Sequence, residues 1–171
     1  AKCAPNSKLM EADLNSSDRT QWRELIAHRD DVQLTNVEAF QQFIVITERQ
    51  GGLKHLRIQD LTKGTDNKIN MPEPAWAIWQ SDNPDYFSTR YRFRYSSLVS
   101  PRKVQSYDIE NGKTDTLKTI PVIGYDQSQY VSKRVLFKSH DGVEVPVSIV
   151  HRKDLDLNKT HPTLLYGYGS Y

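Results

Sequence analysis

Alternation of apolar and polar side chains marks several short strands in the first 120 residues. Tyr91, Phe93 and Tyr95 alternate with arginine and serine, which is the period-two pattern of a strand with one apolar face. Upstream, the β-branched run 43–47 predicts a strand, two consecutive glycines predict a turn, and apolar positions resume over 53–58. The pattern therefore predicts a β-hairpin over 43–58 and a further strand over 91–95.

Three other segments carry weaker strand patterns. They are residues 32–40, 75–79 and 104–109, and an Asn-Gly pair after the last of them is a strong hairpin signal. Trp76 and Trp79 are three positions apart, so a strand would place them on opposite faces. Short strands about ten residues apart, with almost no helical pattern before residue 120, predict a mainly β fold. Periodicity alone leaves a sandwich, a barrel and a propeller open.

The segment around Trp22 fits two kinds of secondary structure. Trp22, Leu25 and Ile26 have the spacing of a helix, whereas Trp22, Glu24 and Ile26 alternate as in a strand. We favour the strand.

Residues 120–126 are predicted to be a connector, because a proline and a glycine interrupt the strand pattern there. Two longer strands, over 131–137 and 143–151, are predicted after it. The second contains Pro146. Since proline cannot donate to a strand ladder, this strand should lie at a sheet edge or carry a bulge.

The last ten residues combine an apolar run with two glycines. The run 163–166 predicts a strand buried on both faces, as in a parallel sheet. Gly167 and Gly169 then bracket Tyr168. Because glycine allows a sharp turn and a close approach of backbone, the phenol between them is expected at the rim of a site.

The composition indicates which cellular location and which classes of partner to expect. The chain has 171 residues, enough for one or two domains, and its 23 basic and 21 acidic side chains give a net charge of +2 without a basic block. Neither nucleic acid nor a membrane surface is therefore indicated as a partner. A single cysteine, Cys3, argues against a disulfide framework and favours a reducing, cytoplasmic location. The start lacks both an initiator methionine and the apolar core of a signal peptide, so we expect an internal segment of a longer protein.

No cofactor or metal is indicated by the motifs. None of the histidines stands at metal-ligand spacing from another ligand residue, and each is expected at a surface or strand edge. They are His28, His55, His140, His151 and His161. The Gly51-Gly52 pair precedes a strand, not a helix, so it is not a phosphate-binding loop.

Four ordered motifs resemble one known family. They are the Tyr-Gly-Tyr-Gly run after Leu-Leu at 164–169, the run 91–98 with Pro101, Val104 and the 107–112 turn, Asp141-Gly142, and the run 145–148. Together they resemble the prolyl oligopeptidase family of serine peptidases, and the Gly-Ser-Tyr ending resembles its oligopeptidase B branch. The resemblance implies a seven-bladed β-propeller followed by an α/β-hydrolase domain. Residues 1–121 would form two to three C-terminal blades, and 122–171 the first strands of the catalytic domain.

The resemblance also implies a chemistry. The family's members are serine oligopeptidases, and the oligopeptidase B branch cleaves short peptides after Arg or Lys, with the propeller restricting substrate size. Tyr168 matches the tyrosine whose hydroxyl donates to the oxyanion. The chain has no Gly-x-Ser-x-Gly motif, so Ser170 is expected to be scaffold, and the catalytic Ser, Asp and His would lie beyond residue 171. The expected partners are short peptides and the remaining blades and catalytic domain of the same protein.

Two alternatives stay open at this point. The 171-residue segment by itself is expected to be inactive, so it could also be a non-catalytic β module that packs or binds. If the branch assignment is wrong, cleavage after proline replaces cleavage after Arg or Lys.

Overall fold

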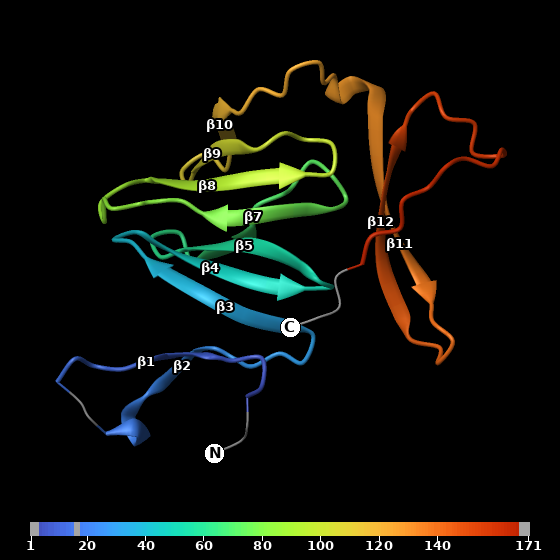
Figure 1. The fold of residues 1–171 in the computed structure, drawn as a ribbon. Helices are drawn as coiled ribbons and strands as arrows, with labels where there is room; N and C mark the ends of the chain where they lie inside the picture. The colour runs from blue at the N-terminus through green and yellow to red at the C-terminus, as the bar shows by residue number, and fades with distance from the viewer. Residues whose placement is uncertain (1–3, 16–17, 168–171) are drawn as a thin grey trace.

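The computed structural model describes residues 4–15 and 18–167, and nearly all of the regular structure there is β-strand (Figure 1). The strands are β1 (Leu9–Glu11), β2 (Arg23–Ile26), β3 (Val32–Ala39), β4 (Phe43–Gln50), β5 (Leu53–Asp60), β6 (Thr65–Lys68), β7 (Trp76–Gln80), β8 (Arg90–Ser97), β9 (Lys103–Asp108), β10 (Thr114–Thr119), β11 (Tyr130–Lys138) and β12 (Glu144–Arg152). Two short 3-10 helices, η1 (Arg19–Gln21) and η2 (Gln127–Gln129), precede β2 and β11. The predicted mainly β fold is confirmed. No helix in the described ranges is long and apolar enough to cross a membrane.

Eight of the strands form two four-stranded antiparallel sheets. One sheet has the order β3-β4-β5-β6 and the other β7-β8-β9-β10, so in each sheet consecutive strands pair as a meander. Figure 1 shows the two sheets next to each other, with β5 and β7 in contact. A four-stranded meander that packs face to face against the next is the blade of a propeller. We call β3–β6 the first blade and β7–β10 the second blade.

The apolar core lies between the two blades. Tyr91, Phe93 and Tyr95 of β8 are at most 1% exposed, which confirms the alternation seen in the sequence. Across the interface, the ring of Phe40 packs edge-on against Tyr91, with ring centroids 6.0 Å apart. Burial of large aromatic side chains is the main stabilising term in such a core. Its other buried members are Phe43, Val45, Leu56, Ile58, Ile69, Ile78 and Tyr107.

The predicted hairpin over 43–58 is confirmed as β4 and β5. Gln50 pairs with Leu53, and Gly51 and Gly52 form the turn between them. Their φ angles are +56° and +80°, in the left-handed region that favours glycine. A two-residue turn with two positive φ angles matches the right-handed twist of the strands that it joins.

The two tryptophans of β7 lie in different environments, as predicted. The indole Nε1 of Trp76 donates to the carbonyl of Lys54 on β5 at 2.6 Å, which links the two blades. Trp79 is 43% exposed, and the guanidinium of Arg102 lies over its ring. Trp76 therefore serves the interface between blades, while Trp79 lies on the outer face of the second blade.

Two smaller sheets flank the blades. One of them pairs β1 with β2, and β2 begins at Arg23, directly after Trp22. The strand predicted for that segment is therefore confirmed. The β11–β12 hairpin stands apart from both blades in Figure 1. In it Pro146 pairs with Leu136 in an unbroken register, and among the described strands β12 pairs with β11 alone. The predicted edge position of the proline-containing strand is confirmed.

Two features of the fold differ from the sequence-based expectations. The strand predicted over 163–166 is wrong, because this segment has no regular structure and Leu164 and Leu165 are 90% and 88% exposed. A strand buried on both faces needs neighbouring strands, and no described strand pairs with it. Conversely, β6 has the sequence Thr-Asp-Asn-Lys and was not predicted. It pairs with β5 as the outer strand of the first blade.

Candidate functional site

Tyr168, which was predicted to donate to an oxyanion, lies outside the described residues, and so does Ser170. The residue that precedes the pair of glycines, Tyr166, is 82% exposed. The role of Tyr168 therefore stays a prediction.

Polar side chains gather where the β11–β12 hairpin meets the blades. We call this region the junction, and we define it by Gly51, Glu73, Val99, Ser100, Tyr125, Gln127 and Arg134. Arg134 of β11 donates through Nη2 to the carbonyl oxygen of Gly51 in the β4–β5 turn. Tyr125, in the connector, donates through its hydroxyl to the carbonyl of Val99 at 2.6 Å. Both contacts join the hairpin side of the chain to the same end of the blades.

A three-residue network holds the connector against the second blade. The hydroxyl of Ser100 donates to Glu73 Oε1. Gln127 Nε2 donates to Ser100 Oγ at 2.9 Å and to Glu73 Oε1 at 3.3 Å. Because the three residues come from separate segments, the network fixes where the connector leaves the second blade. Glu73 Oε1 thus accepts from two donors that belong to the fold, whereas its buried Oε2 has no hydrogen-bond partner among the described residues.

The junction is open and not closely packed. A cleft of about 560 Å³ is lined by Glu73 and Val99 from the blades and by Gln127, Ser132 and Lys153 from the hairpin side. A second, mostly apolar cleft of about 270 Å³ lies between the blades and Ser148 of β12. These two clefts separate parts of the hairpin from the blades. The hairpin therefore does not bury a continuous surface against them.

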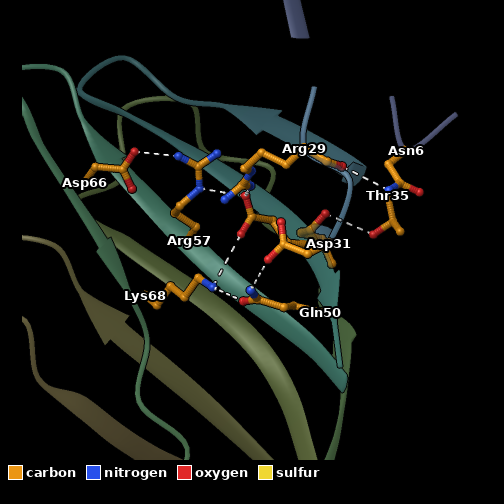
Figure 2. Close-up of polar contacts among 10 residues, drawn as sticks. Asn6, Arg29, Asp31, Thr35, Gln50, Arg57, Asp66 and Lys68 are labelled. Carbon is orange, nitrogen blue, oxygen red and sulfur yellow. Dashed lines mark hydrogen bonds and ion pairs between the residues drawn. The ribbon is translucent and has the colours of Figure 1, made fainter. Parts of the chain in front are cut away.

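A buried carboxylate lies behind the β4–β5 turn. Glu48 of β4 is fully buried, and its Oε1 accepts from Arg57 Nε at 2.8 Å and from Arg29 Nη2. Lys68 Nζ lies 3.9 Å from the other oxygen, Oε2. Arg57 also donates to Asp66 Oδ2 at 2.5 Å. Figure 2 shows these basic side chains converging from β5, β6 and the segment before β3.

Further hydrogen bonds extend this Glu48 network to the segments before β1 and after β2. Lys68 Nζ donates to Gln50 Oε1 at 2.7 Å, and Gln50 Nε2 donates to Asp31 Oδ2 at 2.8 Å (Figure 2). Asn6 Nδ2 donates to the backbone carbonyls of Arg29 and Asp30, at 3.0 Å and 2.7 Å. The segment between β2 and β3 is therefore bonded to Asn6 on one side and to the first blade on the other.

The chemistry available in the Glu48 network is electrostatic. A fully buried carboxylate is tolerated when cations and hydrogen bonds compensate its lost hydration, and this one has two guanidinium groups and an ammonium nearby. Its role is to align the first blade with the segment before β3.

His55 lies beside this network, and its environment favours the neutral imidazole. Burial lowers the pKa of His55, and the positive charge of Lys68 lowers it further. The ring packs edge-on against Trp76, with centroids 5.2 Å apart. Metal binding is not indicated here, because no group of three or more His, Cys, Asp or Glu side chains in residues 4–15 and 18–167 could hold an ion.

Sequence reasoning did not identify Glu48 as a buried residue. The polar triplet Thr47, Glu48 and Arg49 resembles the solvated end of a strand. The signal that could have found it is phase, because Glu48 follows Ile44 and Ile46 at a spacing of two and so faces the same side.

The architecture and the motifs can now be compared with known proteins. The family model described as "Prolyl oligopeptidase, N-terminal beta-propeller domain" matches residues 2–119, which is more than half of the chain. The chain belongs to the prolyl oligopeptidase family. The propeller fold was predicted from the family resemblance, and this match together with the two blades confirms it.

Relatives of this prolyl oligopeptidase family member include several peptidases. Dipeptidyl aminopeptidase BI of Pseudoxanthomonas mexicana is 36% identical over 98% of the chain, and Protease 2 of Moraxella lacunata is 26% identical over 98%. The solved structure of oligopeptidase B from Trypanosoma brucei aligns over 86% of the chain with a TM-score of 0.75 and 32% identity. The chain spans 23%, 24% and 22% of these proteins, so it corresponds to less than a quarter of each.

Proposed function

We propose that this chain is a segment of a serine-type oligopeptidase that hydrolyses short peptides after Arg or Lys. The observation that carries the proposal is the family match over residues 2–119, together with peptidase relatives that align with almost the whole chain. The basic specificity is supported by the likeness to oligopeptidase B. The catalytic Ser, Asp and His of the parent protein belong beyond residue 171, and we place the parent in the cytoplasm.

The proposal divides the chain into a propeller part, 1–121, and the start of an α/β-hydrolase domain, 122–171. The family match ends at residue 119, directly before the connector, which supports this boundary. The separate β11–β12 hairpin that follows also supports it. In the complete protein the propeller would cover the catalytic site and restrict entry to short peptides.

A panel of blocked dipeptide amides tests the specificity of the full-length parent protein. We expect kcat/KM to be higher by orders of magnitude for substrates with Arg or Lys before the scissile bond than for the proline analogue, because a charged pocket that loses its partner leaves buried groups unpaired. Preference for proline would overturn the basic specificity. The 171-residue chain, assayed in parallel, is expected to show no turnover.

The relative with 36% identity is named a dipeptidyl aminopeptidase, which favours a second candidate function, the release of N-terminal dipeptides. Substrates with a free and with a blocked amino terminus distinguish the two candidates. An oligopeptidase cleaves both forms. An enzyme that requires the free amine cleaves the unblocked form alone.

Tyr168 is proposed to donate to the oxyanion in this reaction. Tyr168→Phe in the parent removes the hydroxyl and retains the ring, so we expect kcat to fall by about 10²–10³-fold with little change in KM. Tyr166→Phe is the matched control, because it removes a hydroxyl from the same motif. Unchanged kcat in Tyr168→Phe would exclude this role.

A further inference from the structure

The cleft of about 560 Å³ at the junction is lined by residues that carry polar atoms without partners. Glu73 Oε2 and Ser132 Oγ are buried, and neither has a hydrogen-bond partner in the part of the chain that the structure describes. Ser132 is only 7% exposed. The two residues come from separate elements, the segment before β7 and strand β11. Because buried polar atoms are nearly always hydrogen-bonded, each of these two oxygens calls for a partner that enters the cleft.

Lys153, directly after β12, adds a positive charge to the same cleft. No ion pair between described residues includes Glu73 or Lys153, so two opposite charges line one cleft without pairing with each other. Hydrogen bonds from Ser128 lower the pKa of Asp126, and the positive charge of Lys153 lowers it further. Asp126 already accepts from Ser128 and from Gln129. The ammonium of Lys153 therefore stays available to a ligand.

The other walls and the volume of the cleft suit a small organic molecule. Small-molecule sites in proteins typically enclose about 300–1,000 Å³. Val99 supplies apolar surface, and the ring of Tyr130 is stacked on Tyr125, with centroids 5.3 Å apart. Gln127 Nε2 is a neutral donor to Glu73 at 3.3 Å, and a charged donor bonds more strongly. An ammonium that enters the cleft can therefore displace this amide and reach the carboxylate.

We propose that this cleft binds the free ends of a short peptide, with Glu73 accepting from the terminal ammonium and Lys153 donating to the terminal carboxylate. The hydroxyl of Ser132 can donate to the carboxylate or accept from the ammonium. Hydrolysis of a peptide bond creates a new ammonium and a new carboxylate, so the short products of a peptidase carry both charges. The source of the ligand rests on the proposed function. A bound product would join the segment before β7 to the residue after β12.

Calorimetric titration of the full-length parent with glycylglycine tests this inference. N-acetyl-glycylglycine lacks the ammonium, and glycylglycine amide lacks the carboxylate, so each of these probes removes one charged end. We expect each of them to bind about tenfold more weakly than glycylglycine to the wild-type parent. This factor corresponds to the loss of one hydrogen-bonded charge.

Glu73→Gln should weaken the binding of glycylglycine about tenfold and leave that of N-acetyl-glycylglycine unchanged, because the acetylated probe has no ammonium to lose. The amide oxygen of the new side chain still accepts from Ser100 and Gln127, so the fold is retained. Glu144→Gln, at an exposed position of β12, is the matched control and should bind all three probes as the wild type does.

Lys153→Met should weaken glycylglycine and leave glycylglycine amide unchanged, because the amide has no carboxylate to lose. Lys138→Met, at an exposed position of β11, is its matched control. Ser132→Ala removes no hydrogen bond between described residues, so any effect on affinity reports on the ligand and not on the fold. We expect this variant to bind glycylglycine a few-fold more weakly.

The outcomes separate the site from the proposed function. Equal affinity for the three probes, or an equal effect of Glu73→Gln and Glu144→Gln, would overturn the inference. Absence of glycylglycine binding would overturn it as well. The probe contains neither a basic residue nor proline, so the titration is independent of the specificity of the parent. A parent that cleaves no peptide would contradict the proposed function, whereas the titration would still decide whether the cleft binds both charged ends.

Discussion

The hydroxyl of Tyr91 on β8 donates a hydrogen bond to the carboxylate of Glu38 on β3, so the second blade is tied to the first strand of the first blade. Gln80 Nε2 on β7 donates to the same oxygen at 2.9 Å. Burial raises the pKa of Tyr91, and the hydrogen bond to Glu38 raises it further, so the phenol stays protonated as a donor. The hydrogen bonds of Tyr91 and Gln80 to Glu38 thus join the two blades at the edge of their apolar interface.

Tyr91→Phe should destabilise the propeller without disturbing its packing. The ring remains, but Glu38 loses a donor, and hydrogen bonds to charged groups contribute about 1.5–3 kcal/mol. Urea unfolding of the full-length parent, followed by a signal from the propeller, measures the change. Tyr86→Phe, at a half-exposed tyrosine, is the control and should change the unfolding free energy little. Equal stability of the two variants would mean that Glu38 finds another donor.

Glu48→Gln should be more damaging than any surface charge substitution. It leaves the guanidinium groups of Arg29 and Arg57 beside a neutral amide, and breaking a buried ion pair from one side costs about 3–5 kcal/mol. The same unfolding measurement applies, with the exposed Glu144→Gln on β12 as control. In a double-mutant cycle, adding Arg57→Met should cost less than the sum of the two single changes. Additive costs would contradict direct coupling.

The pH dependence of stability should carry a contribution from His55. Its pKa is below 6.5 in the fold, so below pH 6.5 the unfolded chain binds the proton more readily than the folded one. The contribution of His55 to the free energy of unfolding is therefore fully present above pH 6.5. It is lost as the pH falls from 6.5 through the lowered pKa of His55. Unfolding midpoints between about pH 8 and pH 5 measure this slope. His55→Gln should reduce this slope, and an unchanged slope in that variant would contradict the contribution of His55.

Gly52→Ala compared with Gly64→Ala isolates the contact with Arg134. Both glycines have positive φ, +80° and +64°, so an alanine at either position is strained by about 1–2 kcal/mol. A Cβ at Gly52 would lie 3.3 Å from Arg134 Nη2, whereas none would be met within 4 Å at Gly64. We expect a faster hydrogen exchange of the 127–138 peptide in Gly52→Ala alone, measured on the full-length parent by mass spectrometry. A similar effect in both variants would assign it to backbone strain.

Much of the fold could be predicted because the signals were local. Tyr91, Phe93 and Tyr95 alternate strictly, and Gly51 and Gly52 supply the positive φ angles that their turn requires. Other features depend on neighbours that the local sequence does not reveal. β6 is a polar four-residue strand that exists because β5 offers it a ladder, and the run 163–166 lacks such a neighbour among the described strands.

The site could be predicted less well than the fold. Tyr168 followed from a motif, and it lies outside the described residues, so its role is still a prediction. Glu48 and Arg134 gave no motif, because a buried ion pair and a contact over 83 positions depend on how the segments are brought together. The alternation along β4 indicates that Glu48 faces the same side as Ile46. No pattern in β11 indicates the contact of Arg134.

The meander order of both blades bears on how the chain folds. Each sheet pairs β-strands that are consecutive in sequence, so most of the pairing requires the closure of short loops alone. Low contact order is associated with fast folding, and each blade should therefore assemble early as a unit. Docking of one blade on the next buries the aromatic residues and must follow. During synthesis on the ribosome, the β3–β6 sheet can form before β7–β10 has emerged, which limits the time for which its edges are exposed to other chains.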